Sequence, residues 1–270
     1  MHHEHSKKKK VSVMSAILRS FSINPMAGYS NNKNEANSSQ VSLSQAKNHI
    51  VEMRKNHLLN SLFSEELAYW QPHLELVDMP LNYTMCEAGR KPTYMFFPTT
   101  AIASLMYTTE DGASSEVAII GNDGVVGISL FLTDSPSLNN AVIQSAGQGY
   151  ILRASAVKNI FNRDAMLRTL LRYSQEMITQ VTQNSISNRH YSVDQQLSRR
   201  LLLSLDRVST NDLRMTHEML ANILGVRRES VTEAAIKLQQ AGAISYSRGH
   251  ITILNRLQLE KSCHECYTAF

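Results

Sequence analysis

Three changes of pattern along the chain of 270 residues predict an α+β fold with two domains. Seven of the eleven glycines fall between residues 86 and 150, among short runs typical of β-strands. A segment without Gly or Pro follows at 164–188, and two short helices with a hairpin are predicted near the C-terminus. We therefore divide the chain into a tail (1–43), a β-rich domain with flanking helices (44–163), a long helix (164–190) and a C-terminal domain (191–270).

The composition excludes several classes of protein. Hydrophobic residues make up 43% of the chain, which is enough for a core and rules out disorder throughout. No window reaches the roughly 18 consecutive apolar residues of a membrane span, and the N-terminus lacks the apolar segment of a signal peptide. Three cysteines, Cys86, Cys263 and Cys266, suit a reducing cytosol, so we expect a cytoplasmic protein with no membrane partner.

Charge is unevenly distributed along the chain. The formal net charge is +4, but residues 1–55 carry +6, residues 56–194 carry −5 and residues 195–270 carry +3. Basic ends around an acidic centre indicate a polyanionic partner at one end. The tail holds the lysine run Lys7–Lys10 and the polar segment 30–40, so it is predicted to be disordered, and a solvated tail is favoured over an arm that binds nucleic acid.

The β-rich domain is predicted to begin with helix and to continue with strands. Residues 44–71 carry apolar anchors at helical spacing. Turn signals such as Glu110-Asp111-Gly112 then separate short β-rich runs, and this regular spacing favours a sandwich or a barrel. The predicted strands include 94–98, 101–108, 115–120, 141–145 and 149–154.

The long helix is predicted to carry one narrow apolar stripe. The stripe consists of Leu167, Leu170, Leu171, Met177, Ile178 and Val181, followed by Asn184 and Asn188. Two interpretations stay open: the stripe is the seam of a dimer whose register the asparagines set, or it covers the open face of the sheet. A second amphipathic helix is predicted at 193–207, and residues 209–212 are interpreted as a linker between domains.

The C-terminal segment carries the most specific pattern. Thr216 begins a short helix, and Gly225 ends it because glycine tolerates the left-handed turn. A second helix is predicted from Arg228 to Ala241, and a hairpin at 243–254. Two short helices joined by a glycine turn indicate a helix-turn-helix, whose second helix enters the major groove of DNA, and the hairpin is a wing.

The exposed side of that second helix carries charged and hydroxyl side chains near its N-terminus. An Arg can bond both O6 and N7 of guanine, a Glu can accept from N4 of cytosine, and hydroxyls reach phosphates or bases. The alternative is an ordinary helical hairpin with a solvated polar face, which does not require the glycine turn and the wing to coincide. The residues predicted to contact double-stranded DNA are Arg227, Arg228, Glu229, Ser230, Thr232, Glu233 and Arg248.

The segments GVRRESVTEAAIKLQQAGAI and RGHITILN resemble the C-terminal winged helix of bacterial transcription regulators in the catabolite-activator and fumarate-nitrate-regulator family (Crp/Fnr). Cys86-Glu87-Ala88-Gly89 and the segment 121–131 are similar to parts of that family's cyclic-nucleotide-binding-like β-roll, a double-stranded β-helix or jelly roll. The resemblance covers about 56–260 and implies a β-roll sensor, a long dimerisation helix and a winged helix-turn-helix. It places the family's base-reading Arg and Glu on Arg228 and Glu229, and a third, often basic, reading position on Glu233.

In the predicted sensor the sequence departs from family members that bind cyclic nucleotides. Their Glu that meets the ribose falls on Ile128, and their Arg that meets the phosphate falls at about Asn139. A phosphate with no cation opposite it would be poorly compensated in a shielded pocket, so cyclic AMP is not expected, and the effector is a different small molecule or absent. The residues expected to line an effector pocket are Ile128, Ser129, Asn139, Asn140 and Thr182.

The remaining motifs carry little chemistry. Cys263-His264-Glu265-Cys266 is a single CxxC motif, and an exposed tail is favoured over a metal site because structural zinc needs four ligands. No phosphate-binding loop, nucleophile elbow or carboxylate pair occurs, so we predict no catalytic residue, metal or cofactor, and no enzyme.

The sequence therefore predicts a DNA-binding transcription regulator that reads specific sites. It is expected to be a cytoplasmic homodimer that binds palindromic operators with the helix from about Arg228 and is controlled by the β-roll sensor. RNA polymerase is a candidate partner. The alternative is a ligand-sensing regulatory module that acts through protein partners rather than DNA.

Overall fold

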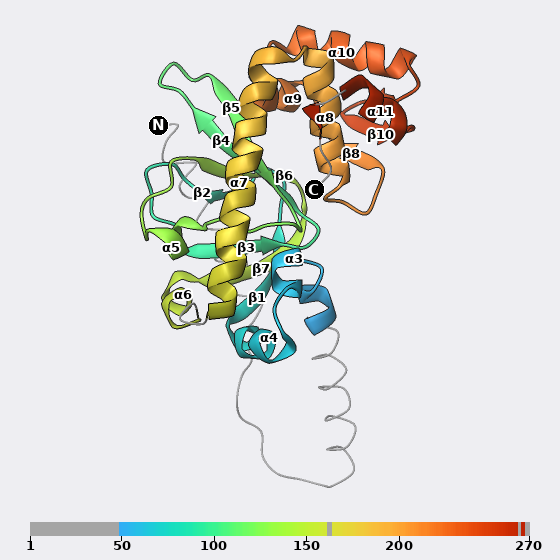
Figure 1. Ribbon diagram of the computed structural model, residues 1–270. Coiled ribbons are helices and arrows are strands. Elements are labelled where there is room, and N and C mark those ends of the chain that lie inside the picture. Colours follow the sequence, from blue (N-terminus) through green and yellow to red (C-terminus); the bar gives the residue numbers. More distant parts are fainter. Residues whose placement is uncertain (1–48, 161–163, 264–265, 268–270) are drawn as a thin grey trace, which may run out of the picture. The chain divides into compact units, whose positions relative to one another are not determined.

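The computed structural model describes residues 49–160, 164–263 and 266–267. The predicted tail at 1–43 lies outside these residues. From Ile50 onward the chain forms a β-roll, a long helix labelled α7, and a C-terminal group of helices and strands (Figure 1).

Two antiparallel sheets form the β-roll. One sheet has the strand order β1-β7-β3 and the other the order β2-β6-β4-β5. Each of the five predicted strands is confirmed to within two residues at either end, and β1 and β2 are additional. The strands are β1 Leu74–Met79, β2 Thr84–Cys86, β3 Tyr94–Pro98, β4 Ile102–Thr108, β5 Ser114–Ile120, β6 Asn140–Ser145 and β7 Gly147–Arg153.

Apolar side chains from both sheets fill the interior of the roll. Successive residues of a strand point to opposite faces, so about every second residue contributes to this core. Burial raises the pKa of the Cys86 thiol to about 11. The buried members are Met79, Met85, Cys86, Phe96, Ala101, Ala103, Ile120, Val126, Ala141, Ile143 and Ile151.

Short helices cover the outer face of the β1-β7-β3 sheet. They are α3 (His57–Asn60), α4 (Ser64–Trp70), a 3-10 turn (Gln71–His73) and α6 (Ala154–Ile160); a further short helix, α5 (Ser129–Leu132), lies between β5 and β6 in the chain. The buried ring of Trp70 meets Phe97 edge to face, with centroids 6.1 Å apart.

The continuous helix predicted over 44–71 is wrong within the described residues. Asn56 interrupts it, because its Oδ1 accepts from the N–H of Leu58 at 3.1 Å and caps α3. Its Nδ2 donates to the main-chain oxygen of Pro98 at 2.9 Å, which ties the start of α3 to the roll.

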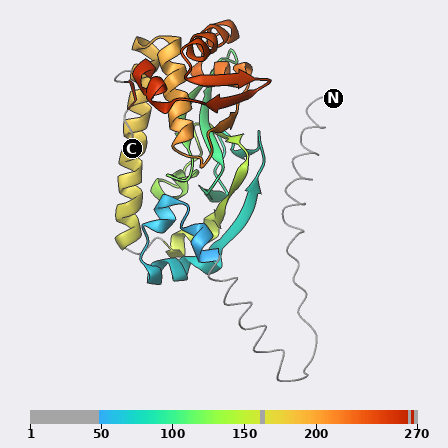
Figure 2. The same ribbon diagram turned by 90° about the vertical axis from the view of Figure 1, so that its right-hand side faces the viewer.

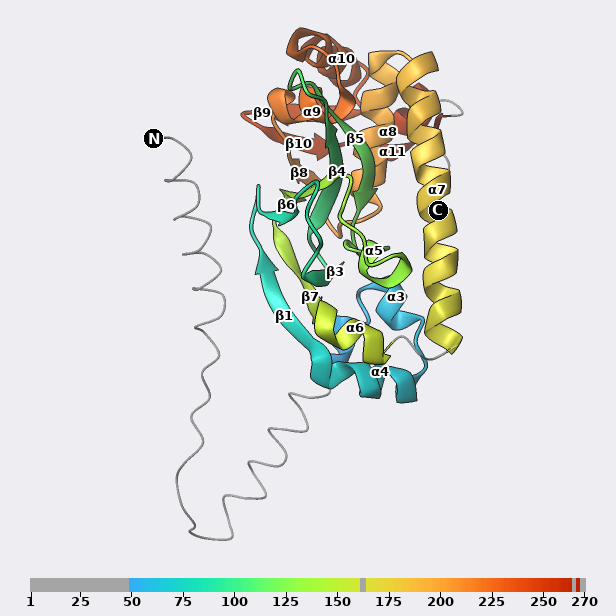
Figure 3. The same ribbon diagram turned by 90° about the vertical axis from the view of Figure 1, so that its left-hand side faces the viewer.

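Helix α7 (Asp164–His190) confirms the predicted long helix and runs along the roll from α6 to α8 (Figure 1). The single stripe predicted from the sequence is wrong, since α7 has two different faces. The inner face packs on the roll and includes Met166, Leu170, Tyr173, Met177, Gln180 and Asn184. The outer face exposes Leu167, Leu171, Ile178 and Val181. Figure 3 shows α7 at the edge of the described body, so this outer face meets solvent.

The C-terminal elements pack around a separate apolar core (Figure 2). The predicted linker at 209–212 is partly wrong, because it runs into β8, which pairs with β10 at the edge of the wing. The last helix, α11, was not predicted. The elements are α8 Val193–Leu205, β8 Asp212–Arg214, α9 His217–Leu224, α10 Arg228–Gln240, β9 Ile244–Ser247, β10 His250–Ile253 and α11 Arg256–Cys263. None of the helices described combines the length and the apolar character needed to cross a membrane.

Candidate nucleic-acid interface

The turn between α9 and α10 forms where the sequence predicts it. Thr216 caps α9, since its Oγ1 accepts from the N–H of Met219 at 3.1 Å. Gly225 ends α9 with φ +67°, a left-handed conformation that residues with a Cβ rarely adopt. Val231 and Ala234 of α10 are fully buried, so the opposite side of α10 faces outward.

The first turns of α10 present the residues predicted to contact DNA. Arg227, Arg228, Glu229 and Glu233 are exposed, whereas Ser230 and Thr232 are half-buried. Thr232 is already engaged inside the domain, because its Oγ1 donates to the main-chain oxygen of Arg228 at 3.1 Å and lies 2.9 Å from Nδ1 of His217. Its hydroxyl is thus less available to DNA than the sequence suggests.

The wing is the hairpin of β9 and β10, with Arg248 and Gly249 at its turn. Arg248 is exposed and has φ +48°, and Gly249 has φ +82°. Two consecutive residues in the left-handed region are typical of a tight hairpin turn whose twist matches its strands. The turn therefore holds the Arg248 side chain at the tip of the wing.

Two residues that the sequence analysis missed join the three parts of this domain. The ring of His217, at the start of α9, stacks on Tyr246 of β9 with centroids 4.1 Å apart and planes 20° apart. The contact of His217 with Thr232 adds α10. Burial, together with the charge of Arg228, lowers the pKa of His217, which favours the neutral ring.

The chemistry of this face suits a nucleic acid. The guanidinium groups of Arg227 and Arg228 stand at the N-terminus of α10, where the helix dipole adds positive charge. The carboxylates of Glu229 and Glu233 follow them in the next turns of the helix and are also exposed. Guanidinium donors and carboxylate acceptors are the groups that pair with base edges, and cations also meet phosphates.

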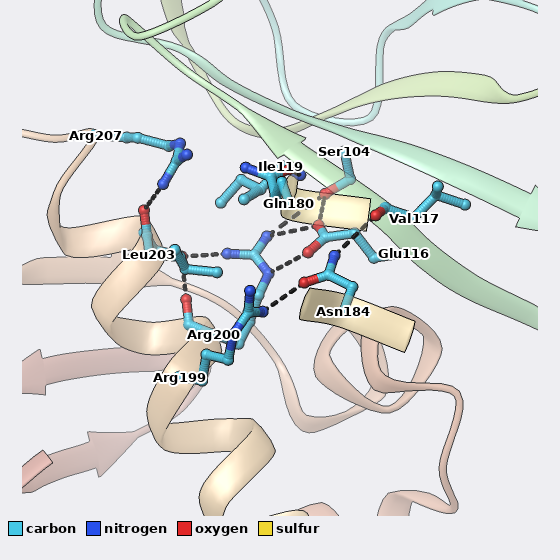
Figure 4. Close-up of polar contacts among 11 residues, drawn as sticks. Ser104, Glu116, Val117, Ile119, Gln180, Asn184, Arg199, Arg200, Leu203 and Arg207 are labelled. Atoms are coloured by element: carbon cyan, nitrogen blue, oxygen red, sulfur yellow. Dashed lines mark hydrogen bonds and ion pairs between the residues drawn. The ribbon is translucent and has the colours of Figure 1, made fainter. Parts of the chain in front are cut away.

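A buried ion pair joins this domain to the roll (Figure 4). Nε of Arg200 in α8 lies 2.9 Å from Oε1 of Glu116 in β5, and its Nη2 lies 3.1 Å from Oε2. Both side chains are about as buried as core residues, at 3% and 5% exposure. The hydroxyl of Ser104 in β4 also donates to Glu116, so the carboxylate is held from two strands and one helix.

Two further arginines extend the junction. Arg199 bonds Asn184 of α7, whose Nδ2 donates to the main-chain oxygen of Val117 in β5 at 2.8 Å. Nε of Arg207 donates to Asp123 at 3.1 Å. Burial lowers the pKa of Arg199 to about 10, against the opposing effect of Glu116. The sequence analysis missed this cluster; its one signal is a pair of arginines beside three consecutive leucines in α8.

The residues expected to line an effector pocket make the following local contacts. Ile128 and Ser129 lie at the start of α5, and Ile128 packs on the core that includes the buried side chains of α3 and α4. Asn140 accepts from the N–H of Ala88 at 2.9 Å, and Asn139 bonds the hydroxyl of Ser137. Thr182 is exposed on α7, with its hydroxyl bonded to Ile178 of the same helix.

A cavity of about 420 Å³ lies beside α7 rather than among those residues. Its wall includes Asp123, Tyr173, Gln180 and Arg207. The phenol of Tyr173 donates to the main-chain oxygen of Val125 at 3.0 Å.

The exposed tail expected at the CxxC motif is wrong for its two cysteines. Cys263, the last residue of α11, and Cys266 are buried and form a disulfide with their Cα atoms 5.6 Å apart. Both belong to the core of the C-terminal domain. In the part of the chain that the structure describes, no group of three or more potential metal ligands is found.

Comparison with known proteins identifies the C-terminal domain. Residues 195–262 match the model of the Crp-like helix-turn-helix domain. No curated protein matches the chain.

Several solved structures of transcription regulators have a similar fold. A Crp/Fnr-family transcriptional regulator from Eubacterium rectale is similar with a TM-score of 0.60 and 20% identity, covering 76% of this chain and 97% of that one. FixK2 from Bradyrhizobium japonicum is similar with a TM-score of 0.59 and 14% identity, covering 70% of this chain and 96% of that one. CLP from Xanthomonas campestris is described as a c-di-GMP-responsive global regulator. It is similar with a TM-score of 0.57 and 13% identity, covering 72% of this chain and 100% of that one.

These findings agree with the elements described above. The matched segment begins in α8, spans α9, α10 and the wing, and ends in α11. The similar structures extend the likeness to the β-roll and α7. The resemblance to the Crp/Fnr family is therefore confirmed: the chain has the fold of these transcription regulators, and its residues 195–262 match the Crp-like helix-turn-helix domain.

Proposed function

We propose that this protein is a homodimeric transcription regulator that reads palindromic DNA with α10 and the wing. The observation that carries the proposal is the exposed set of Arg227, Arg228, Glu229 and Glu233 on the outward side of a helix whose inner side is buried. Regulators of this type bind as dimers, because two recognition helices one DNA turn apart meet two half-sites.

The outer face of α7 supports the homodimer. It carries a stripe at alternating intervals of four and three residues, which is the spacing of a helix that packs against a like helix. Ile178 and Leu171 are 60% and 51% exposed in the single chain, so this stripe offers apolar surface for a partner. The stripe consists of Leu167, Leu171, Ser174, Ile178, Val181, Ser185 and Asn188.

A signal in the roll would reach α10 through α8. The ion pair of Arg200 with Glu116 and the bonds of Arg199 and Arg207 hold α8 on β5, α7 and Asp123. Strand β5 also packs against α9, and a Cβ added to Gly225 would lie 3.2 Å from Cβ of Ser115. A change of packing in β4, β5 or α7 would therefore shift the whole DNA-binding domain.

Arg228→Ala tests the assignment of α10. The wild-type protein first selects a duplex from a random library, and the affinity of both proteins for it is then compared. We expect a loss of about 1–3 kcal/mol, or roughly 5- to 150-fold in affinity, with base preference flattened at one position of each half-site. Arg90→Ala is the matched control, because Arg90 is an exposed arginine of the roll that pairs with nearby Glu87. Equal weakening on every sequence would assign Arg228 to phosphate contact alone.

The effector is proposed to be neither cyclic AMP nor cyclic GMP. With Ile128 and Asn139 in place of a carboxylate and a guanidinium, two charge-assisted hydrogen bonds of about 1.5–3 kcal/mol each are lost. The loss of both bonds lowers the affinity for a cyclic nucleotide by at least about a hundredfold. Calorimetry with either nucleotide at micromolar concentration is expected to give no binding heat, and a panel with cyclic di-GMP covers the ligand class of CLP. Micromolar binding of cyclic AMP would contradict the assignment of these two positions.

A further inference from the structure

The C-terminal residues 266–267 lie across α8 as a strap. The main-chain oxygen of Cys266 accepts from Nε of Arg199 at 2.8 Å. The phenol of Tyr267 donates to Asp206, at the C-terminus of α8, and accepts from Nη2 of Arg256 at 2.8 Å. The strap therefore contacts α8 both in its middle and at its end.

The disulfide is a second covalent link, besides the main chain, between this strap and α11. Cys263 ends α11, which packs on α8, and Cys266 begins the strap. A loop of so few residues restricts the unfolded chain little, so the bond matters mainly for where Cys266 is held. Opening it would remove this side-chain link and leave the main chain as the remaining covalent connection between the strap and α11.

Arg199 connects the strap to the rest of the protein. It is buried, and its guanidinium has three acceptors: the oxygens of Cys266, Asn184 and Gln183. Asn184 continues the connection to Val117 of β5. If the Cys266 carbonyl moves away, Arg199 loses a charge-assisted bond in a buried site, and the junction between α8, α7 and β5 loosens.

The contact of Cys266 with α8 itself depends on its oxidation state. Its Sγ lies 3.7 Å from the main-chain oxygen of Gln195, in the first turn of α8. A disulfide sulfur carries no proton to donate, whereas a thiol is a weak donor. Reduction thus changes the bonding of Cys266 at a point one helical turn from Arg199.

From these contacts we propose that Cys263 and Cys266 form a reversible thiol–disulfide site whose oxidised state fixes the DNA-binding domain to α7 and the roll. In proteins of reducing compartments, disulfides are usually transient and sense redox conditions. This site lies outside the residues assigned above to DNA or effector.

The proposed reaction is exchange with a small dithiol or its disulfide. A thiolate of the reductant attacks Sγ of Cys266, which keeps 7% exposure while Cys263 is fully buried. The Cys263–Cys266 bond breaks and a mixed disulfide forms. The second thiolate of the reductant then displaces Cys266, so the reductant becomes a disulfide, and two electrons and two protons reside on the two cysteine thiols. Oxidation runs through the same steps in reverse.

The test uses the full-length protein equilibrated with oxidised or reduced dithiothreitol. Thiol alkylation after an acid quench and denaturation, followed by mass spectrometry, is expected to find one modified cysteine in the oxidised protein and three in the reduced protein. Cys86 serves as an internal control, since it is free and is therefore modified in both states. Failure of the pair to oxidise, even with excess oxidised dithiothreitol, would overturn the proposal.

Hydrogen exchange then measures the effect on α8. Because reduction removes one bond to a buried charged donor, exchange in residues 193–205 is expected to accelerate by about tenfold, while residues 57–70 are unchanged. The double variant Cys263→Ala/Cys266→Ala should exchange like the reduced protein in both buffers, and Cys86→Ala should retain the response. Equal exchange of the wild-type protein in both states would overturn the proposed coupling.

A consequence for DNA affinity rests on the proposed function, whereas the thiol chemistry does not. The selected duplex should bind the oxidised and reduced wild-type proteins with different affinity, and the double alanine variant with one affinity. If alkylation and exchange respond as expected but no duplex is ever enriched, the proposed function fails and the redox site stands.

Discussion

Ile178→Glu is expected to convert the proposed dimer into monomers. Ile178 lies at the centre of the outer stripe of α7, and a partner helix at that place would bury a carboxylate without a counter-charge. Loss of the dimer removes the linkage of two half-sites, so affinity for the selected duplex should fall by about 10²- to 10⁴-fold. Sedimentation velocity reports the mass, and titration of the duplex reports the affinity.

Thr179→Glu is the matched control, because Thr179 is the next residue, is exposed and lies off the stripe. It should remain dimeric and bind DNA as the wild type does. Met177 is unsuitable for this test, since it packs on the roll from the inner face of α7. A dimeric Ile178→Glu protein with normal affinity would remove the stripe from the dimer interface.

Arg200→Met is expected to lower the free energy of unfolding by about 3–5 kcal/mol. The substitution leaves Glu116 as a buried carboxylate whose cation is gone, and burial penalises such a charge. Urea denaturation followed by circular dichroism measures the change. Burial lowers the pKa of Arg200, whereas the charge of Glu116 raises it. The charged guanidinium is therefore stabilised by its partner Glu116.

The double variant Arg200→Met/Glu116→Leu separates the ion pair from its packing. Removing both charges together restores an apolar contact, so its stability should return close to that of the wild type. A double variant as unstable as Arg200→Met would show that the loss comes from packing alone.

The strands of the roll and the helix-turn-helix could be predicted because their signals are local. Short turns separate neighbouring strands such as β4 and β5, and the turn at Gly225 needs a left-handed conformation that glycine supplies. The predicted helix from Arg228 to Ala241 ends one residue from the helix observed. The predicted continuous helix over 44–71 failed because Asn56 bonds Pro98, which lies 42 residues away.

The faces of α7 could not be separated from the sequence. Leu170 and Leu171 are neighbours, yet the first is fully buried against the roll and the second is half exposed. Spacing along the sequence does not distinguish two apolar stripes on one helix. The stripes differ only because one of them packs on the roll. Asn184, for example, faces inward because its amide reaches Val117, 67 residues earlier.

Buried polar groups were the other failure. An arginine is mostly exposed in proteins, so the single signal, Arg199 and Arg200 beside three leucines, was too weak to predict that α8 joins the roll through them. Their acceptors Glu116 and Asp123 lie more than eighty residues away from Arg200 and Arg207. The cysteine pair likewise could be read only as a motif, because its burial depends on how α11 packs on α8.

The most direct test of this account is the salt dependence with which wild-type protein binds the duplex that it selects from a random library. We expect an inverted repeat with half-sites about 10–10.5 base pairs apart, at least about 10³-fold preference over random DNA, and a logarithmic affinity that falls linearly and steeply with the logarithm of salt. A library from which nothing is enriched, or an affinity that salt leaves unchanged, would contradict the account and favour a module that acts through protein partners.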